Sequence, residues 1–177
     1  FIAIAATGGV YHSLGLKADG SIVGWGDNAY GQLNVPAPNS GFVAVAAGAY
    51  HSLGLKPDGS IVAWGWNSYG QTNDPAPNSG FVAVAAGGNH SLGLKIDGSI
   101  VAWGCGGPNN YGQCNVPAPG TRFVAVAGGA YHSLAIRRVP GACCDTNGAD
   151  RGCRDDVAQV DCSDADDTWS ENATCAE

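Results

Sequence analysis

The stretch FVAVAAGAYHSLGLKPDGSIVAWGWNSYGQ, residues 42–71, decides the fold because the chain repeats it. Copies begin at Phe1, Phe42, Phe81 and Phe123, and only the last of them is incomplete. Successive copies therefore start about 40 residues apart, a period typical of solenoids, propellers and other repeat arrays.

Each copy has the periodicity of β-strands. Residues 42–46 form a short β-branched run, and residues 52–56 and 60–64 alternate in polarity. Pro57-Asp58-Gly59 separates the second run from the third and is a turn signal, because Pro presets φ and Gly accepts positive φ. We predict three short antiparallel strands per unit, followed by a long connection over residues 67–80, and no helix.

A three-stranded unit of this size needs neighbours on both faces to bury its apolar side chains. Radial closure of such units gives a β-propeller. The first strand carries Ala44, Ala46, Ala47 and Gly48, which suit the crowded axis, whereas the tryptophans of the third strands suit the roomier periphery. These tryptophans are Trp25, Trp64 and Trp103.

The pattern G-x-x-H-S-L-x-L-K-x-D-G-S-I-V-x-W-G-x-N-x-Y-G-Q resembles the repeat of the regulator of chromosome condensation superfamily. That resemblance covers about residues 1–136 and implies blades of a β-propeller, sevenfold in that group. The short period looks most like the bacterial branch, which includes the propeller-type β-lactamase inhibitory protein. It implies a fold more than a function, and β-lactamase inhibition does not follow from blade residues.

The predicted fold class is all-β, a partial propeller of about three and a half three-stranded blades. The units are 1–41, 42–80, 81–122 and an incomplete 123–138, followed by a cysteine-rich acidic tail, 139–177. Because the last unit stops after two strands, we expect further repeats upstream of Phe1, or a second copy of the chain, to supply the remaining blades.

Composition excludes several function classes. Of the 177 residues only 13% are charged, and the net charge of −7 offers no basic face to nucleic acid. No apolar run approaches the ~18 residues of a membrane-spanning helix. No catalytic motif is present, and Asp19, Asp58 and Asp97 lie in Asp-Gly turns. We therefore expect neither an enzyme nor a cofactor.

Antiparallel connectivity places the first loop of each unit and the start of its long connection at the same end of the blade. This end gathers aromatic side chains among Asn and Gln, a composition that protein and sugar interfaces favour. We predict a binding surface here, for a protein or alternatively a glycan, formed by Tyr11, Asp27, Tyr30, Tyr50, Trp66, Tyr69, Asn89, Tyr111 and Tyr131.

Positions shared by every unit are interpreted as structural. The histidines His12, His51, His90 and His132 each precede a serine, and we expect hydrogen bonds between blades from them, not metal ligation. Asn28, Asn67 and Asn110 should fix the long connection through bonds to its backbone. Function has more room where units differ, at Asp27, Trp66, Asp74 and Asn89.

Cysteines indicate an oxidising compartment. Cys105 and Cys114 flank an insertion of two residues in the third unit, which predicts a local disulfide. The tail adds five more cysteines, an odd number: Cys143, Cys144, Cys153, Cys162 and Cys175. It has no zinc spacing, and its aspartates lack the pattern of an EF-hand calcium loop. We expect a secreted or cell-surface protein.

Two function classes follow from these residues. The first is a non-enzymatic extracellular binding module that uses its aromatic face. The second is a structural or adhesion platform within a larger surface protein, without a discrete ligand site.

Overall fold

The computed structural model describes residues 1–6, 11–118 and 120–138, which contain strands and no helix. The chain divides into two units, Phe1–Arg138 and Val139–Glu177. The strands are β1 (Ala3–Ala5), β2 (His12–Leu16), β3 (Ile22–Gly26), β4 (Ala44–Ala47), β5 (His51–Leu55), β6 (Ile61–Gly65), β7 (Phe81–Ala86), β8 (Ser91–Lys95), β9 (Ile100–Trp103), β10 (Phe123–Gly128) and β11 (Ser133–Arg137).

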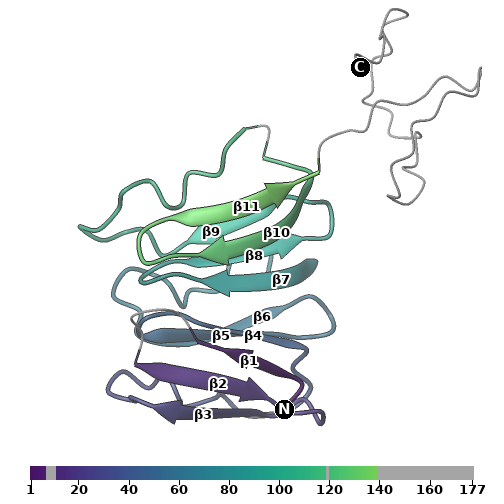
Figure 1. Cartoon of the computed structure of the whole chain (residues 1–177), viewed down its shortest axis with the longest axis vertical. Coiled ribbons are helices and arrows are strands. Elements are labelled where there is room, and N and C mark those ends of the chain that lie inside the picture. The colour runs from purple at the N-terminus through teal and green to yellow at the C-terminus, as the bar shows by residue number, and fades with distance from the viewer. Residues whose placement is uncertain (7–10, 119, 139–177) are drawn as a thin grey trace, which may run out of the picture. The chain divides into compact units, whose positions relative to one another are not determined.

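These strands form antiparallel sheets that follow one another in chain order (Figure 1). Three sheets have three strands each, β1-β2-β3, β4-β5-β6 and β7-β8-β9, and the fourth consists of β10 and β11. The prediction of three-strand meanders and a two-strand last unit is confirmed.

The hairpin between the second and third strands has the predicted turn chemistry. The Asp58 carboxylate accepts both the backbone N–H and the hydroxyl of Ser60, at 2.9 and 2.7 Å, and these bonds lower the pKa of Asp58. Gly59 has φ of +77°, a conformation that only glycine adopts without strain. Asp19 and Asp97 make the same bonds in their units, so these aspartates are conformational.

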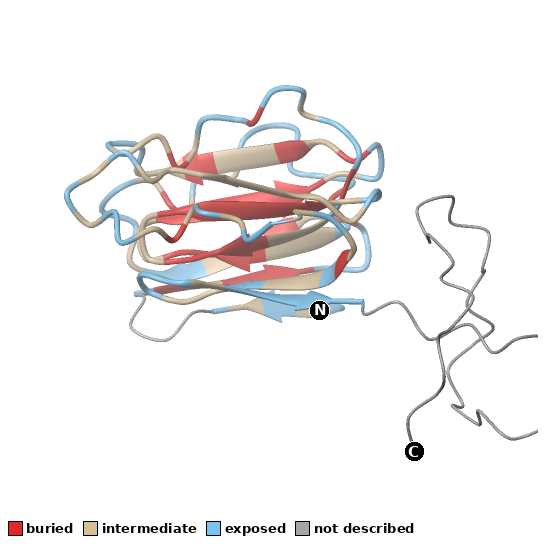
Figure 2. Cartoon of the chain, turned by 90° about the horizontal axis from the view of Figure 1, so that it is seen from above, coloured by how far each residue is buried: buried red, intermediate tan, exposed pale blue. Residues whose placement is uncertain are grey.

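The core lies between the sheets. Leu14, Leu16 and Ile22 of the first sheet pack against Phe42 and Trp64 of the second. The second sheet repeats the arrangement with the third, with Leu53, Leu55 and Ile61 against Phe81. In Figure 2 the buried residues accordingly gather in the middle of the stack.

The outer faces of the first and last sheets expose large apolar side chains whose equivalents in the inner sheets are buried. Phe1 is 71% exposed and Trp25 47%, whereas Phe42 and Trp64 are buried in the second sheet. In the last sheet, Leu134 and Ile136 are 61% and 64% exposed. Both faces therefore have the composition of an interface between sheets.

The first strand of each later sheet contacts the sheet before it, and its side chains are small. The strands β1, β4, β7 and β10 contact one another from sheet to sheet, as the alanines and glycines predicted. The loops that follow them are hydrogen-bonded across sheets, and the Gly88 N–H donates to Ala130 O at 3.1 Å. A Cβ on Gly128 would collide with the Ala86 backbone, so this approach requires glycine.

The long connection is tied back to the blade that it leaves. The Asn78 side chain accepts from Ile61 N at 2.8 Å and donates to Ile61 O at 2.7 Å. The next first strand then begins with Phe81 N donating to Gly59 O at 3.0 Å. Because Asn39 and Phe42 make equivalent bonds one unit earlier, the repeated spacing produces a repeated step between sheets. The fold is a partial β-propeller.

Candidate functional site

Aromatic side chains from two units form one cluster at the predicted end of the blades. Trp66 lies at its centre, with ring centroids 4.9 Å from Tyr69, 5.6 Å from Tyr50 and 5.8 Å from Tyr30. Tyr50 also contacts Tyr30 at 5.2 Å and stacks with Tyr11 at 6.2 Å. We call these five residues the Trp66 cluster.

Backbone bonds at the ends of the strands position the cluster. Tyr50 ends the first loop directly before β5, and Trp66 follows β6 directly. The Trp66 N–H donates to Tyr50 O at 2.9 Å, and the Asp27 N–H donates to Tyr11 O at 2.7 Å in the first unit. The side chains on both loops are therefore held together, as the connectivity predicted.

The cluster is half-buried on one side and exposed on the other. Tyr11 and Tyr30 are 61% and 50% exposed, whereas Tyr50, Trp66 and Tyr69 are half-buried. On the far side of Tyr69 lies Gly107, where a Cβ would collide with the tyrosine ring. Aromatic rings in edge contact are stabilised by about 0.5–1.5 kcal/mol per pair beyond their burial, so these contacts favour the observed orientations.

The remaining predicted residues lie outside the cluster. Tyr111 and Tyr131 form a separate pair, with ring centroids 5.5 Å apart. Asp27 supports its own loop, since it accepts from Gln32 Nε2 at 2.9 Å and from Ala29 N at 3.2 Å.

Two unit-specific residues, Asn89 and Asp74, also lie apart from these rings. Asn89 Oδ1 is buried and has no hydrogen-bond partner among the described residues. Asp74 lies on a loop, and partial desolvation of its carboxyl raises the pKa of this group. A hydrogen bond with the backbone of Ala63 acts in the opposite direction but is the smaller effect. The structure therefore brings together five of the nine predicted binding residues in the Trp66 cluster, and the other four lie outside this cluster.

The asparagines and glutamines fix the start of each long connection, as predicted. Asn67 Oδ1 accepts from Thr72 N at 3.0 Å, and Gln71 Oε1 accepts from Tyr69 N at 2.9 Å. Asn28 and Asn110 likewise accept from the backbone of their own loops. These bonds hold Tyr69 and its equivalents at the rim of the blade.

Three of the four histidines connect neighbouring sheets, as predicted, whereas His132 of the last sheet makes no such bond within the described residues. His12, His51 and His90 each place Nε2 2.9 Å from the hydroxyl of the next unit's serine, Ser52, Ser91 and Ser133. That serine donates its only proton to a glutamine carbonyl of the preceding unit, at 2.7 to 2.9 Å. The histidine must therefore carry its proton on Nε2.

Burial keeps these histidines neutral. His51 is fully buried, and burial lowers its pKa to about 3, with smaller contributions from the charges of His90 and His12. Burial also lowers the pKa of His12 and of His90. Their Nδ1 atoms have no described partner, and Gly48 leaves the space that the His51 ring occupies.

The backbone carbonyls of the glutamines accept hydrogen bonds from the next unit, and the sequence analysis did not predict this role. Gln32 O accepts from Ser52 and also from Trp64 Nε1, the latter at 2.8 Å. Gln71 O accepts from Ser91 and from Trp103 Nε1 in the same way. A glutamine follows Tyr-Gly in three units, and this repetition could have indicated a shared structural role. It does not indicate that the backbone carbonyl is the atom involved.

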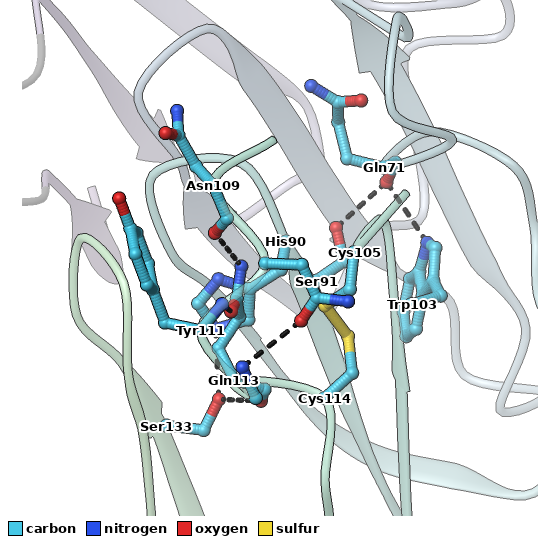
Figure 3. Close-up of a disulfide and its surroundings, with 12 residues drawn as sticks. Gln71, His90, Ser91, Trp103, Cys105, Asn109, Tyr111, Gln113, Cys114 and Ser133 are labelled. Carbon is cyan, nitrogen blue, oxygen red and sulfur yellow. Dashed lines mark hydrogen bonds between the residues drawn. A yellow bond between two sulfur atoms is a disulfide. The ribbon is translucent and has the colours of Figure 1, made fainter. Parts of the chain in front are cut away.

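Cys105 and Cys114 form the predicted disulfide, with Cα atoms 6.2 Å apart (Figure 3). It closes the loop that carries Gly107 and Tyr111. The tail cysteines Cys143, Cys144, Cys153, Cys162 and Cys175 lie outside the described residues. Over the described ranges, no group of three His, Cys, Asp or Glu side chains is placed to hold a metal ion, and no helix is long and apolar enough to cross a membrane.

Comparison with solved structures finds several similar chains. Prp20p from Saccharomyces cerevisiae, described with its binding to Gsp1p and histones, superimposes with a TM-score of 0.63 and 22% identity over 77% of this chain. The CRINKLY WD40 ectodomain of the Arabidopsis thaliana receptor kinase ACR4 gives a TM-score of 0.62 and 25% identity over 79% of this chain. The ectodomain of the Physcomitrella patens receptor kinase CR4 gives 0.60 and 22% over 78%.

The chain spans only 43%, 52% and 38%, respectively, of the length of these three structures. A search of the curated proteins finds no sequence that matches it. A family profile described as the regulator of chromosome condensation (RCC1) repeat matches residues 1–32, 42–71 and 81–113, more than half of the chain. The propeller blades and these three matches together show that the chain belongs to the RCC1 repeat family.

Proposed function

We propose that this chain is an extracellular binding module that recognises a protein partner through the Trp66 cluster. The chain has the RCC1-repeat propeller fold, and Prp20p, which shares that fold, is described with its binding to Gsp1p and histones; both support a protein-binding role. The observation that carries the proposal is that residue 66 is a tryptophan. In the first unit an aspartate at this position bonds to a glutamine inside the blade, whereas Trp66 gives up that bond and adds to the aromatic surface.

Trp66 occupies the position that Asp27 has in the first unit. There the carboxylate accepts from Gln32 Nε2, but in the second unit Gln71 Nε2 is buried and has no hydrogen-bond partner within the described ranges. A buried donor without an acceptor costs about 1–3 kcal/mol. A residue that leaves such a donor unpaired, and instead presents an indole among four tyrosines, suits a surface selected for binding.

The Trp66 cluster also has the chemistry of a protein interface. Its rings are rigid and amphipathic, so they bury area on a partner with little loss of conformational entropy. No lysine or arginine stands among its members, and the carboxylate of Asp27 is already paired to Gln32 and Ala29. A partner would therefore bind mainly by apolar contact and by hydrogen bonds to the tyrosine hydroxyls.

The extracellular location rests on the cysteines. A disulfide between Cys105 and Cys114 and five further cysteines in the tail suit an oxidising compartment. Two of the similar propellers are receptor-kinase ectodomains, which supports the same setting. A cytosolic pool of the natural protein with Cys105 and Cys114 reduced, detected by thiol labelling and mass spectrometry, would contradict this part of the proposal.

The test is the variant Trp66→Asp, which copies the first unit. It should supply an acceptor for Gln71 Nε2 and so offset part of the lost ring contacts, leaving a folded chain by circular dichroism. Partners identified by co-purification with the full chain are then measured individually by titration calorimetry. Loss of a central aromatic anchor should weaken binding by about 30-fold or more.

The control is Tyr111→Ala, which removes an aromatic ring from the separate pair at the same end. Partner affinity should change little in this variant. Equal losses in both variants, or binding that is insensitive to Trp66→Asp, would refute the proposed surface. Capture of arrayed glycans in place of proteins would redirect the proposal to sugar, and a chain that binds neither would favour a structural platform.

A further inference from the structure

The charged side chains of the described residues are divided unequally between the two ends of the blades. We call the end with the Asp-Gly turns the hairpin end, and the end with the first loops, the starts of the long connections and the Trp66 cluster the loop end. All lysines and arginines of the described ranges lie at the hairpin end, beside a turn or at the end of the last sheet: Lys17, Lys56, Lys95, Arg122, Arg137 and Arg138. The described part of the loop end therefore has no cation that would repel a positively charged partner.

Asp27 is the only Asp, Glu, Lys or Arg among the described residues of the loop end. Its N–H donates to Tyr11 O at 2.7 Å, and its carboxylate accepts from the backbone of the loop that leads to Tyr30, at 3.2 Å. The carboxylate also accepts from Gln32 Nε2 at 2.9 Å, and Gln32 lies against the glycine directly before Trp66. Asp27 therefore borders the Trp66 cluster.

The Asp27 carboxylate has room for a further donor. Ala29 N donates to Oδ1 and Gln32 Nε2 to Oδ2, so each oxygen has accepted one hydrogen bond. A carboxylate offers about four acceptor positions, and this side chain is only partly buried. Within the described ranges no cation pairs with Asp27, because the lysines and arginines all lie at the other end. Its charge and two of its acceptor positions are therefore available to a partner.

The geometry of the rings favours a planar cation over a compact one. Tyr30, Tyr50 and Trp66 contact one another with ring centroids 5.2 to 5.8 Å apart and interplanar angles of 51° to 82°. Rings in mutual contact do not enclose a quaternary ammonium as an aromatic cage does. Tyr11 and Tyr30 are 61% and 50% exposed and so offer ring surface to a partner. A guanidinium is planar, and it can stack on such a ring while its N–H groups donate to a carboxylate.

We propose that the protein partner presents an arginine to the loop end, with its guanidinium stacked on the exposed ring of Tyr30 and donating to the Asp27 carboxylate. This inference rests on the proposed function, because it concerns the same surface, and it adds a charged contact to the apolar contact of the Trp66 cluster. The separation of charge between the two ends supports the same orientation, since complementary potentials steer a basic segment toward the loop end.

The probe is the peptide GSLRLSG, acetylated and amidated so that the arginine carries its only charge. Titration into the isotope-labelled full chain, followed by NMR, should show saturable shifts of the backbone amides of residues 27–32 and of the Trp66 indole N–H. The same peptide with citrulline, which has the shape of arginine without its charge, should bind at least about fivefold more weakly. A peptide with trimethyllysine should also bind more weakly than the arginine peptide, because its ammonium cannot donate to a carboxylate.

Two variants of the full chain locate the contact. Asp27→Asn removes the charge and keeps one side-chain oxygen for its own loop, and it should erase most of the difference between the arginine and citrulline peptides. Asp58→Asn makes the same change in a turn at the hairpin end and should leave that difference unaltered. Both variants change the net charge equally, so attraction to the acidic residues of the tail cancels in the comparison. If Asp27→Asn fails to fold, the peptide series and the amides that shift in the intact chain still decide.

Equal binding of the arginine and citrulline peptides overturns the inference. Equal losses in the two aspartate variants do the same, because net charge alone would then explain the binding. Tighter binding of the trimethyllysine peptide would overturn the choice of arginine. A natural partner whose affinity falls with Trp66→Asp but not with Asp27→Asn would leave the proposed function intact and overturn this inference alone.

Discussion

Ser91 joins the second sheet to the third, and Ser91→Ala tests that connection most directly. Its Oγ accepts from His51 Nε2 at 2.9 Å and donates to Gln71 O at 2.8 Å. The substitution deletes both bonds. His51 Nδ1 has no hydrogen-bond partner among the described residues, so neither ring nitrogen of this fully buried histidine would then be bonded to them. Gln71 O would keep its bond from Trp103.

The magnitude follows from which group loses its only partner. A buried donor left unpaired costs about 1–3 kcal/mol, whereas an acceptor that keeps another donor loses much less. The space left by one oxygen atom adds a small packing term. We therefore expect Ser91→Ala to lower the free energy of unfolding by about 2–3 kcal/mol.

The assay is urea unfolding of the full chain with free thiols alkylated, followed by far-UV circular dichroism. Ser13→Ala is the matched control, because Ser13 has the same place in the first unit and its side chain makes no hydrogen bond to the described residues. That control should change stability by no more than about 0.5 kcal/mol. Equal shifts in the two variants would refute the role assigned to the histidine–serine bond.

Two further results are expected of the same chain. Unfolded His51 takes up a proton below its ordinary pKa of 6.5, whereas folded His51 stays neutral down to a pKa of about 3. As pH drops through this window, His51 alone should therefore lower the free energy of unfolding by about 1.4 kcal/mol per pH unit, and His12 and His90 add to the fall. Urea midpoints between pH 7.5 and 4 measure this, and His51→Gln should reduce the slope by about one proton; an unchanged slope would contradict it. Replacing Cys105 and Cys114 by serine removes a crosslink of sequence separation 9 and should lower the free energy of unfolding by about 2–3 kcal/mol, measured by thermal unfolding. Unchanged stability would mean that the contact with Tyr69 holds the loop without the disulfide.

The sequence alone predicted the features that depend on residues close together in the chain. The repeat, the Asp58-Gly59 turn and the strand alternation depend on neighbouring residues, and the structure has them at nearly the predicted positions. The pairing of Cys105 with Cys114 was also accessible, because both flank one insertion. The prediction that loops at the same end would gather aromatic residues followed from antiparallel connectivity alone.

Tertiary structure decided the contacts between units. Trp66 contacts Tyr30 across one unit boundary and Tyr111 contacts Tyr131 across another, because the step from one sheet to the next determines which rings meet. The bond from Trp64 to Gln32 O spans 32 residues, and no local pattern specifies it. A cleft beside Gln113 likewise became visible only in the folded chain, because residues of two units line it. The burial of Gln71 Nε2 without a hydrogen-bond partner among the described residues also required the tertiary structure.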